Sequence, residues 1–336
     1  MESTNILVTG IGGDFGQAIV KCLCLMERPL HLLGCDIAPE VGTAFVDGVF
    51  TVPRANDPDY LPTVQELCRH HRVAAVIPAS EAEIEVLSRA VFAEGVALGA
   101  VLVCQQYQWF QAYGDKLACF QNLAGRVELV PFADGGDVAA VHRFVQEVGF
   151  PCVVKSRRSW GSKSIQIARN EEELTAMLAR TSLPLVQQYI DDGLGEFSVG
   201  VFRNAAFTTA VAFKRDLGPV GASWYADNFD QDQEVLAYAL AIAEASAVQG
   251  SCNVQVRKSA KGVRLLEINP RFSSLVAARA LCGFRDLEWS LLEALGEEVA
   301  APPDAYARIR FRRFFHELVD SGNGYRGIAA WRPRET

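Results

Sequence analysis

The stretch Leu266-Glu267-Ile268-Asn269-Pro270-Arg271 decides the fold, and it ends a run in which apolar and polar residues alternate. A second alternating run covers residues 251–257, and the turn Ser259-Ala260-Lys261-Gly262 separates the two. Two such runs around a short turn that contains glycine predict a β-hairpin. With the turn centred near Lys261, Gln255 is expected directly opposite Glu267.

One face of this hairpin is predicted to be polar. The two-residue period of a strand puts Glu267, Asn269 and Arg271 on the face of Gln255, and it turns Leu266 toward the core. Carboxylate and amide oxygens suit Mg²⁺ that bridges nucleotide phosphates, and a guanidinium suits phosphate or carboxylate. Taken alone, these residues fit an exposed polar sheet face without a ligand equally well.

The composition excludes several classes of partner. The chain has 336 residues, half of them hydrophobic, which predicts two to three domains with buried cores. A net charge of −8 argues against a broad nucleic-acid-binding surface. Its nine cysteines form no CxxC pair, as expected in a reducing compartment. With no basic leader and no apolar run of about 18 residues, we expect a cytoplasmic protein that does not enter a membrane.

The first hundred residues alternate apolar strands with amphipathic helices. Strands are predicted at residues 6–8, 30–35, 50–53, 73–78 and 101–103, with helices at residues 14–26, 59–71 and 81–92. Continuous apolar strands of this kind indicate a parallel sheet covered on both faces. We therefore expect an α/β, Rossmann-like domain over residues 1–112, with a linker at residues 105–114 that leads into the next part of the chain.

The rest of the chain predicts two α+β parts. Residues 113–184 are expected to form a small subdomain, with helices at 115–124, 136–148 and 171–180 and strands at 151–155 and 164–168. Residues 185–330 carry five alternating runs, at 185–189, 196–203, 206–213, 251–257 and 263–269, which indicate an antiparallel sheet. Helices at 230–247 and 286–296 are expected to pack on that sheet.

Lys155 closes the apolar run of residues 150–154. A lysine at the end of a buried strand must reach water or an anion, because burial of an unpaired ammonium is costly. The loop of residues 156–164 that follows is small and basic, and its N–H groups suit the covering of a polyphosphate. By itself, a lysine that extends to solvent from a polar hairpin is the commoner interpretation.

These features occur together, in the order and at the spacings of the ATP-grasp superfamily. Over residues 1–300 the chain resembles the carbamoyl-phosphate synthetase large subunit and related carboxylate–amine ligases. The most specific part is Asn253-Val254-Gln255 followed by residues 266–271. The resemblance implies that Gln255, Glu267 and Asn269 hold one or two Mg²⁺ ions, for which Mn²⁺ can substitute. It also implies that Arg271 contacts the transferring γ-phosphoryl group or the acyl acceptor.

The resemblance also implies a set of ATP contacts. Lys155 and Lys116 would meet the phosphates, with Ser162 in the covering loop and Glu196 as the acidic nucleotide contact. The adenine hinge would consist of Gln188, Tyr189 and Ile190.

The chain departs from the family pattern at two places. The hinge of the family usually begins with Glu, whereas Gln187-Gln188 stands here. The covering loop is normally rich in glycine but has only Gly161 here, together with Arg157 and Arg158. Since adenine is recognised largely by backbone groups, ATP binding is still expected.

The resemblance implies an ATP-grasp fold with an N-terminal Rossmann-like domain and an ADP-forming ligase. Such an enzyme activates a small carboxylate, most often an amino acid, as an acyl phosphate for attack by an amine or a thiol. Its partners would be these small molecules, with a homodimer as a compatible assembly. Candidate substrate contacts are Ser80, Glu81 and Arg279, the first two at the carboxyl end of a parallel strand. For Glu81, an acidic residue favoured at a helix N-terminus is the simpler explanation.

A rival interpretation comes from Thr9-Gly10-Ile11-Gly12-Gly13-Asp14-Phe15-Gly16, which with Asp36 fits a dinucleotide-binding fingerprint. It favours an NAD(P)-dependent oxidoreductase or epimerase. However, the chain contains no Tyr-x-x-x-Lys pair, and its parallel strands end near residue 104, too early for a six-stranded dinucleotide-binding fold. A non-catalytic ATP-binding module is a third alternative.

Overall fold

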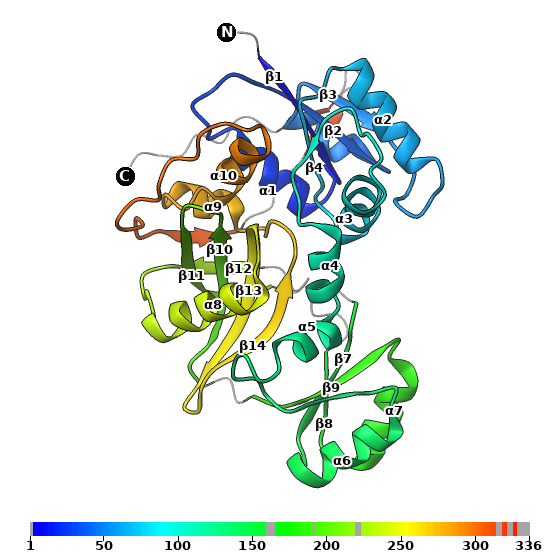
Figure 1. Cartoon of the computed structure of the whole chain (residues 1–336), viewed down its shortest axis with the longest axis vertical. Coiled ribbons are helices and arrows are strands. Elements are labelled where there is room, and N and C mark those ends of the chain that lie inside the picture. Colours follow the sequence, from blue (N-terminus) through cyan, green and yellow to red (C-terminus); the bar gives the residue numbers. More distant parts are fainter. Residues whose placement is uncertain are drawn as a thin grey trace. The chain divides into compact units, whose positions relative to one another are not determined.

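The computed structural model describes residues 3–158, 165–190, 193–218, 223–313, 318–320 and 325–327. The chain divides into two compact units (Figure 1). The first comprises Met1–Tyr107, Arg271–Ala307 and Arg312–Thr336, and the second comprises Gln108–Pro270 and Arg308–Phe311. Among the described residues, no helix is both long enough and apolar enough to cross a bilayer.

A five-stranded parallel sheet forms the centre of the first unit, as predicted. Its strand order is β3-β2-β1-β4-β5, and each neighbouring pair is parallel. The order reverses between β1 and β4, and open parallel sheets bind ligands beyond the carboxyl ends of the strands at such a point. The strands are β1 (Thr4–Thr9), β2 (Leu30–Asp36), β3 (Gly48–Thr51), β4 (Ala75–Ile77) and β5 (Val101–Leu102).

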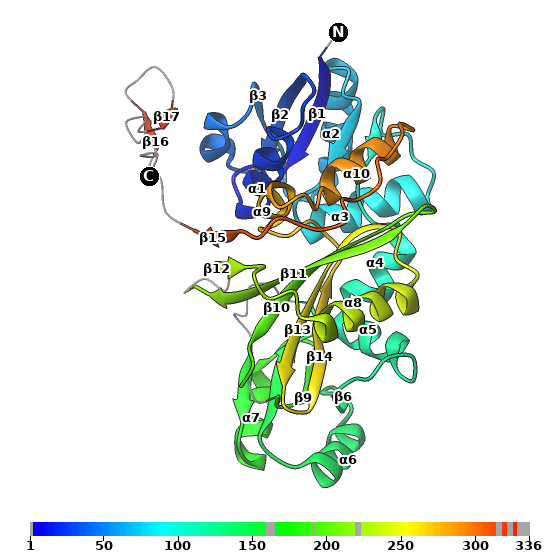
Figure 2. The ribbon, with the colours of Figure 1, turned by 90° about the vertical axis from the view of Figure 1, so that its left-hand side faces the viewer.

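Helices cover both faces of this sheet (Figure 2). Ile6 and Val8 of β1 are buried with α1 (Asp14–Leu23), α9 (Val276–Leu281) and α10 (Asp286–Ala294). Leu7 is buried on the other side, with α2 (Tyr60–His70) and α3 (Glu81–Ser88). Because successive residues of β1 enter different cores, the strand is apolar throughout. Short helical turns follow at Pro39–Ala44 after β2 and at Arg89–Ala93 after α3.

The structure corrects two predictions about helices. Residues 105–114 are largely helical: α4 (Tyr107–Gly114) occupies most of the predicted linker and buries Phe110 and Tyr113, and the boundary between the two units falls at its start, between Tyr107 and Gln108. The predicted helix at 286–296 does not pack on the antiparallel sheet. It forms α10, whose Leu287 and Leu291 lie one helical turn apart and join the core of the parallel sheet.

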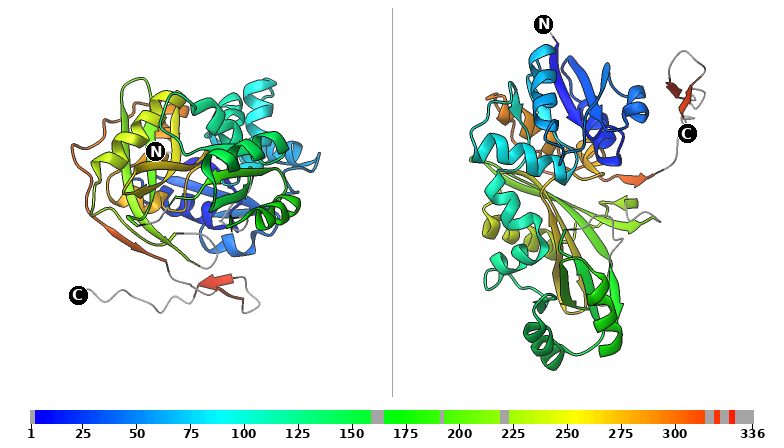
Figure 3. Two further views of the ribbon diagram at one scale, coloured as in Figure 1. Left: turned by 90° about the horizontal axis from the view of Figure 1, so that it is seen from below. Right: turned by 90° about the vertical axis from the view of Figure 1, so that its right-hand side faces the viewer.

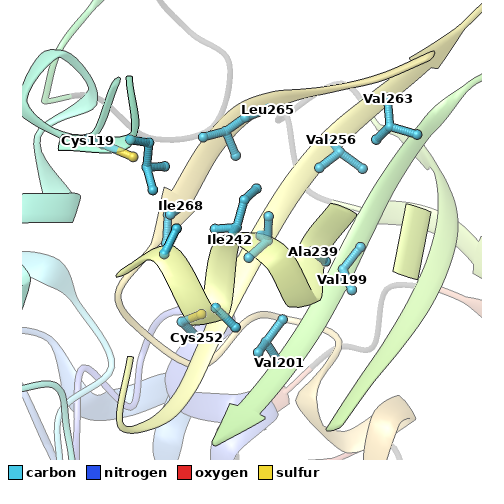
Figure 4. Packing of buried hydrophobic residues seen from close by; sticks show 14 of the residues in the cluster. Cys119, Val199, Val201, Ala239, Ile242, Cys252, Val256, Val263, Leu265 and Ile268 are labelled. Carbon is cyan, nitrogen blue, oxygen red and sulfur yellow. The ribbon is translucent and has the colours of Figure 1, made fainter. Parts of the chain in front are cut away.

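The second unit contains a sheet with the strand order β14-β13-β10-β11-β12-β15. The pairings from β14 to β12 are antiparallel, which confirms the predicted sheet type, but the run predicted at 185–189 does not join this sheet and pairs elsewhere. One face packs against α8 (Gln233–Ser246) and α5 (Lys116–Leu123), and Figure 4 shows Ile242 and Cys119 of these helices beside Leu265 and Ile268. The strands are β10 (Glu196–Arg203), β11 (Thr208–Leu217), β12 (Ser223–Asp227), β13 (Gly250–Ser259), β14 (Gly262–Asn269) and β15 (Arg310–Arg312).

The β13–β14 hairpin has the predicted turn and pairs Gln255 with Glu267, but it contains a bulge. Val256 pairs with Leu265, so Leu266 is an additional residue on β14 without a partner on β13. Leu265, and not Leu266, is therefore the leucine in the core, where it is fully buried. The prediction for Leu266 is wrong because strict alternation assumes a regular ladder.

A four-stranded antiparallel sheet completes the second unit, in the order β6-β9-β7-β8. One face is covered by α6 (Val138–Val148) and α7 (Glu171–Arg180), against which Val154 and Val186 pack (Figure 3). The strands are β6 (Phe132–Asp134), β7 (Cys152–Ser156), β8 (Gln166–Ala168) and β9 (Pro184–Gln188). Near the end of the chain, β16 (Leu318–Asp320) pairs with β17 (Tyr325–Gly327).

Candidate active site

A row of polar side chains crosses the face of the six-stranded sheet opposite α8. Glu196 of β10 pairs with Arg215 on β11 and with Arg257 on β13. Gln255 lies two residues before Arg257, on the same face of β13, and Glu267 lies opposite Gln255 on β14. Core residues such as Phe197 and Val254 alternate with this row.

Two arginines hold Glu196. Arg215 donates from Nε to Glu196 Oε1 at 3.0 Å and from Nη2 to Gln255 Oε1 at 2.7 Å. Arg257 donates from Nη2 to Glu196 Oε2 at 2.9 Å and from Nη1 to the carbonyl oxygen of Ile190 at 3.4 Å. The acidic residue predicted to contact the nucleotide is thus fixed between two guanidiniums. One of these also contacts the predicted hinge.

Two lysines from other elements reach Glu267. Lys116 is the first residue of α5, and its Nζ lies 3.2 Å from Glu267 Oε2. Lys155, near the end of β7, donates from Nζ to the carbonyl oxygen of Leu266 at 2.8 Å. Asn269 Nδ2 donates to Glu267 Oε1 at 3.3 Å. The structure therefore brings together four predicted site residues: Lys116, Lys155, Glu267 and Asn269.

The bulge explains how Lys155 is held. Because Leu266 has no partner on β13, its carbonyl lies outside the regular ladder and accepts from a side chain. Lys155 is only 5 % exposed, and an ammonium buried to that extent requires such an acceptor. The extra residue of β14 thus places the lysine beside Glu267.

The electrostatics of the cluster follow from burial and from neighbouring charges. Burial lowers the pKa of Lys155 from 10.5 to about 8, even though Glu267 acts to raise it. Burial alone would raise the pKa of Glu267, but Lys116 and Lys155 outweigh it and lower this pKa. Among the described residues of the polar row and its two lysines, the four cations Lys116, Lys155, Arg215 and Arg257 are paired with two carboxylates, Glu196 and Glu267. The excess of positive charge suits a polyanion.

The beginning of the predicted covering loop is tied to α5. Asp115 caps α5 by accepting from the backbone N–H groups of Leu117 and Ala118. Arg157 donates from Nε to both carboxylate oxygens of Asp115, at 3.0 and 3.1 Å, and its carbonyl accepts from the N–H of Lys116 at 3.2 Å. Arg157 therefore anchors the loop. Ser162 lies outside the described residues.

The residues on this face fit a magnesium ion that also binds phosphate. The described residues contain no cluster of three or more His, Cys, Asp or Glu suited to a metal, and the predicted trio has a single carboxylate, Glu267. The amide oxygens of Gln255 and Asn269 are hard ligands of the kind that Mg²⁺ accepts. Since one carboxylate and two amides carry little negative charge, phosphate oxygens would have to supply the remaining negative charge around the ion.

At the hinge, the structure separates two neighbouring glutamines. Gln188 lies on the face of β9 that carries Val186, toward α6 and α7, and its N–H donates to the carbonyl of Pro131 at 3.0 Å. Gln187 lies on the opposite face, with Lys155 of β7. Tyr189 and Ile190 follow directly after the strand.

Arg271 belongs to the first unit, where three groups hold it. Its guanidinium carbon lies 3.7 Å from the centre of the Phe15 ring, and its Nε lies 3.4 Å from Glu81 Oε1. Its Nη1 donates to the carbonyl of Phe272 at 3.3 Å. Glu81 is therefore an ion-pair partner as well as a first-turn residue of α3. Ser80 caps α3 in a reciprocal arrangement with Glu83.

Arg279 has a structural role. It is 1 % exposed, its Nη1 lies 3.3 Å from Asp286 Oδ2, and its Nη2 donates to Ser273. Asp286 is also fully buried, so the two charges compensate each other inside the core of the first unit. We therefore do not assign Arg279 to the substrate.

The glycine-rich turn after β1 is closed by the protein itself. Asp36 accepts the N–H of Gly12 at 2.9 Å and the N–H of Ala38 at 3.2 Å, so its carboxylate serves the turn. A Cβ on Gly16 would lie 2.3 Å from the carbonyl oxygen of Gly10, so Gly16 is required for close packing of α1 on the strand. These contacts explain the motif without a dinucleotide.

Arg215 and Arg257 belong to the polar row, and the sequence interpretation assigned neither of them to the nucleotide. Both lie on the same strand faces as Glu196 and Gln255, so strand periodicity offered a signal for them. This periodicity identifies the two arginines as partners of Glu196 only once the pairing of β10 with β11 and β13 is known.

Three family models match different parts of the chain, two of which overlap at residues 180–190. The model for ATP-grasp in the biosynthetic pathway with Ter operon matches residues 180–315. The model for the carbamoyl-phosphate synthase L chain, ATP binding domain, matches residues 120–190, and the PylC-like N-terminal domain model matches residues 27–98. Together these matches include the four-stranded sheet, most of the polar row and much of the parallel-sheet domain.

Among curated relatives, the chain is similar to the carbamoyl phosphate synthase large chain, N-terminal section, of Methanopyrus kandleri. The two are 25% identical over 223 residues, which cover 60% of this chain and 36% of that protein. Among solved structures, biotin carboxylase from Campylobacter jejuni in complex with β,γ-ATP has a TM-score of 0.72 at 12% identity, covering 89% of this chain and 72% of that one. N5-carboxyaminoimidazole synthetase from Staphylococcus aureus has a TM-score of 0.69 at 16% identity, covering 91% and 80%. The predicted fold class is confirmed.

Proposed function

Because this chain has the ATP-grasp fold and the sequence of an ATP-grasp domain, we propose that it is an ATP- and Mg²⁺-dependent, ADP-forming ligase. It would activate a small carboxylate, such as that of an amino acid, for attack by an amine. The observation that carries the proposal is the cluster of Lys116, Lys155 and Glu267 beside Gln255 and Asn269. A polar face that served only solvation would not bury a lysine against a carbonyl of the metal-binding hairpin.

In this proposal, binding and charge neutralisation are the main contributions of the protein. Lys155 and Lys116 bind the phosphates, and Glu267, Asn269 and Gln255 hold Mg²⁺, which supplies further positive charge when it is bound. A substrate carboxylate oxygen forms a bond to the γ-phosphorus while the bond to the β,γ-bridging oxygen breaks, which yields an acyl phosphate and ADP. The amine nitrogen then attacks the acyl carbon, and phosphate and a proton leave.

The proposed function is tested by ADP release. Purified protein is incubated with ATP, Mg²⁺ and pools of amino acids or other small carboxylic acids, with and without an amine. ADP formation is expected to depend on one acid, and mass spectrometry should then find the amide. A protein that binds ATP but forms no ADP with any pool would be a binding module instead.

The pH dependence of nucleotide binding tests the role of Lys155. Since burial lowers its pKa from 10.5 to about 8, the ammonium destabilises the folded protein below pH 8, and this penalty disappears as the pH rises toward 10.5. Phosphate binding requires the charged form, so ADP affinity should fall by up to about tenfold per pH unit above pH 8. Calorimetric titration at pH 7 to 9.5 measures this fall. Lys155→Arg, which stays charged, should show little of it, and equal pH slopes in the two proteins would contradict the assignment.

A further inference from the structure

Gln187 is a buried amide with an unsatisfied donor. The residue is 4 % exposed, and its Nε2 is buried without a hydrogen-bond partner in the part of the chain that the structure describes. Burial of an amide N–H without an acceptor destabilises the folded protein. Buried polar side chains usually have partners, so an unpaired one beside a candidate ligand site is a group that a ligand can satisfy.

The position of Gln187 on its strand points to a nucleotide. Val153 of β7 pairs with Gln187, and Lys155 pairs with Leu185, two residues earlier on β9. Because Val154 and Val186 face the helices, Lys155 and Gln187 share the other face. Diagonal neighbours of this kind are separated by about 7–8 Å. The unpaired amide therefore lies close to the lysine that we assign to the phosphates.

Gln187 also directly precedes the hinge. Gln188, Tyr189 and Ile190 follow it, and the family resemblance assigns their backbone groups to the purine edge. On β9, Gln187 lies between this hinge and Leu185, the partner of Lys155, on the shared face, since Gln188 faces α6 and α7. Its side chain is thus placed to meet the base itself.

We infer that Gln187 reads position 6 of the purine, and that this site accepts 6-oxopurine nucleotides, such as those of inosine and guanosine, as well as ATP. The inference rests on the proposed ATP-dependent function. A carboxylate, the group that the family usually has where Gln187-Gln188 stands here, only accepts hydrogen bonds and so selects the 6-amino group of adenine. An amide has both an acceptor for a 6-amino group and a donor for a 6-oxo group. The unpaired Nε2 is that donor.

The test compares ADP with IDP, because the two bases differ at position 6 and in the proton on N1, and neither has a 2-amino group; the Gln187 variants separate the contribution of position 6. Calorimetry with Mg²⁺ is carried out on the wild type, Gln187→Glu and Gln187→Leu, with the exposed Gln146→Glu as a control. The wild type should bind IDP within about tenfold of ADP. Gln187→Glu should leave the affinity for ADP unchanged and should weaken the affinity for IDP by about 10–100-fold, because a carboxylate that faces a 6-oxo group leaves both acceptors unpaired. Gln187→Leu should weaken the binding of both ligands, and Gln146→Glu should change the binding of neither.

The outcomes separate this inference from the proposed function. Wild-type protein that binds neither ADP nor IDP would refute ATP-dependent activity itself. ADP binding with IDP more than about 100-fold weaker would overturn the role of Gln187 and leave the ATP-dependent function intact. An IDP-to-ADP ratio that is the same in the wild type and Gln187→Glu would overturn it as well.

Discussion

Glu267→Ala should reduce ADP formation by at least about 10²-fold, because the substitution removes the only carboxylate of the predicted metal trio. It also removes the partner of Lys116 and the charge that keeps Lys155 protonated, so both lysines lose stabilisation at the phosphates. Steady-state rates at saturating ATP and Mg²⁺ measure the loss. The Mg²⁺ concentration needed for half-maximal rate should rise as well.

Controls separate this effect from unfolding. Glu267→Ala leaves two lysines less well paired, at a cost of about 1–3 kcal/mol, which a domain with typical stability of about 5–15 kcal/mol tolerates. Glu267→Gln keeps the shape of the side chain and removes only its charge, so it should be nearly as inactive. Glu147→Ala, on the exposed side of α6, should retain full activity. A folded Glu267→Ala protein with wild-type turnover would refute the metal assignment.

Arg271→Ala should lower kcat by about 10³-fold, since the family resemblance puts this guanidinium at the transferring phosphoryl group or the acceptor. Its stacking on Phe15 and its ion pair with Glu81 fix the guanidinium, so little freedom is lost when the substrate binds. The ADP dissociation constant should change much less than kcat, because the contact is proposed to act mainly in the transition state.

Two companion variants sharpen this test. Arg271→Lys keeps the charge but loses the planar group that stacks on Phe15, so it should recover little activity. Arg69→Ala removes an exposed arginine of α2 and should have no effect. A dissociation constant for ADP that rises in parallel with the loss of kcat would show that Arg271 serves ground-state binding, in contrast to the role proposed here.

The sequence was sufficient to predict the central hairpin and most of the strands and helices along the chain. Strand period and turn length together determined that Gln255 faces Glu267, which the register confirms. The alternation of apolar strands and helices likewise predicted a parallel sheet. Both are local properties, in which a short segment determines its own geometry.

What the sequence did not predict depends on contacts between distant segments. Arg215 and Arg257 lie 19 and 61 residues from Glu196, and only the joint register of three strands brings them to it. The burial of Arg279 depends on Asp286, which itself looks like an ordinary helix N-terminal residue. The core contacts of α10 with α1 join segments more than 250 residues apart in a chain of 336. Such pairings follow from the whole fold and leave no periodic signal.

The bulge at Leu266 has a consequence for how this site can be lost in evolution. Deleting that one residue would restore a regular ladder and would still leave Glu267 on the face of Gln255. A sequence alignment would still show every residue of the cluster, yet Lys155 would lose the carbonyl oxygen that accepts its hydrogen bond. Part of the proposed nucleotide site is therefore encoded in the number of residues between Leu265 and Glu267. A homologue that is one residue shorter there could lose phosphate affinity while appearing intact by residue identity.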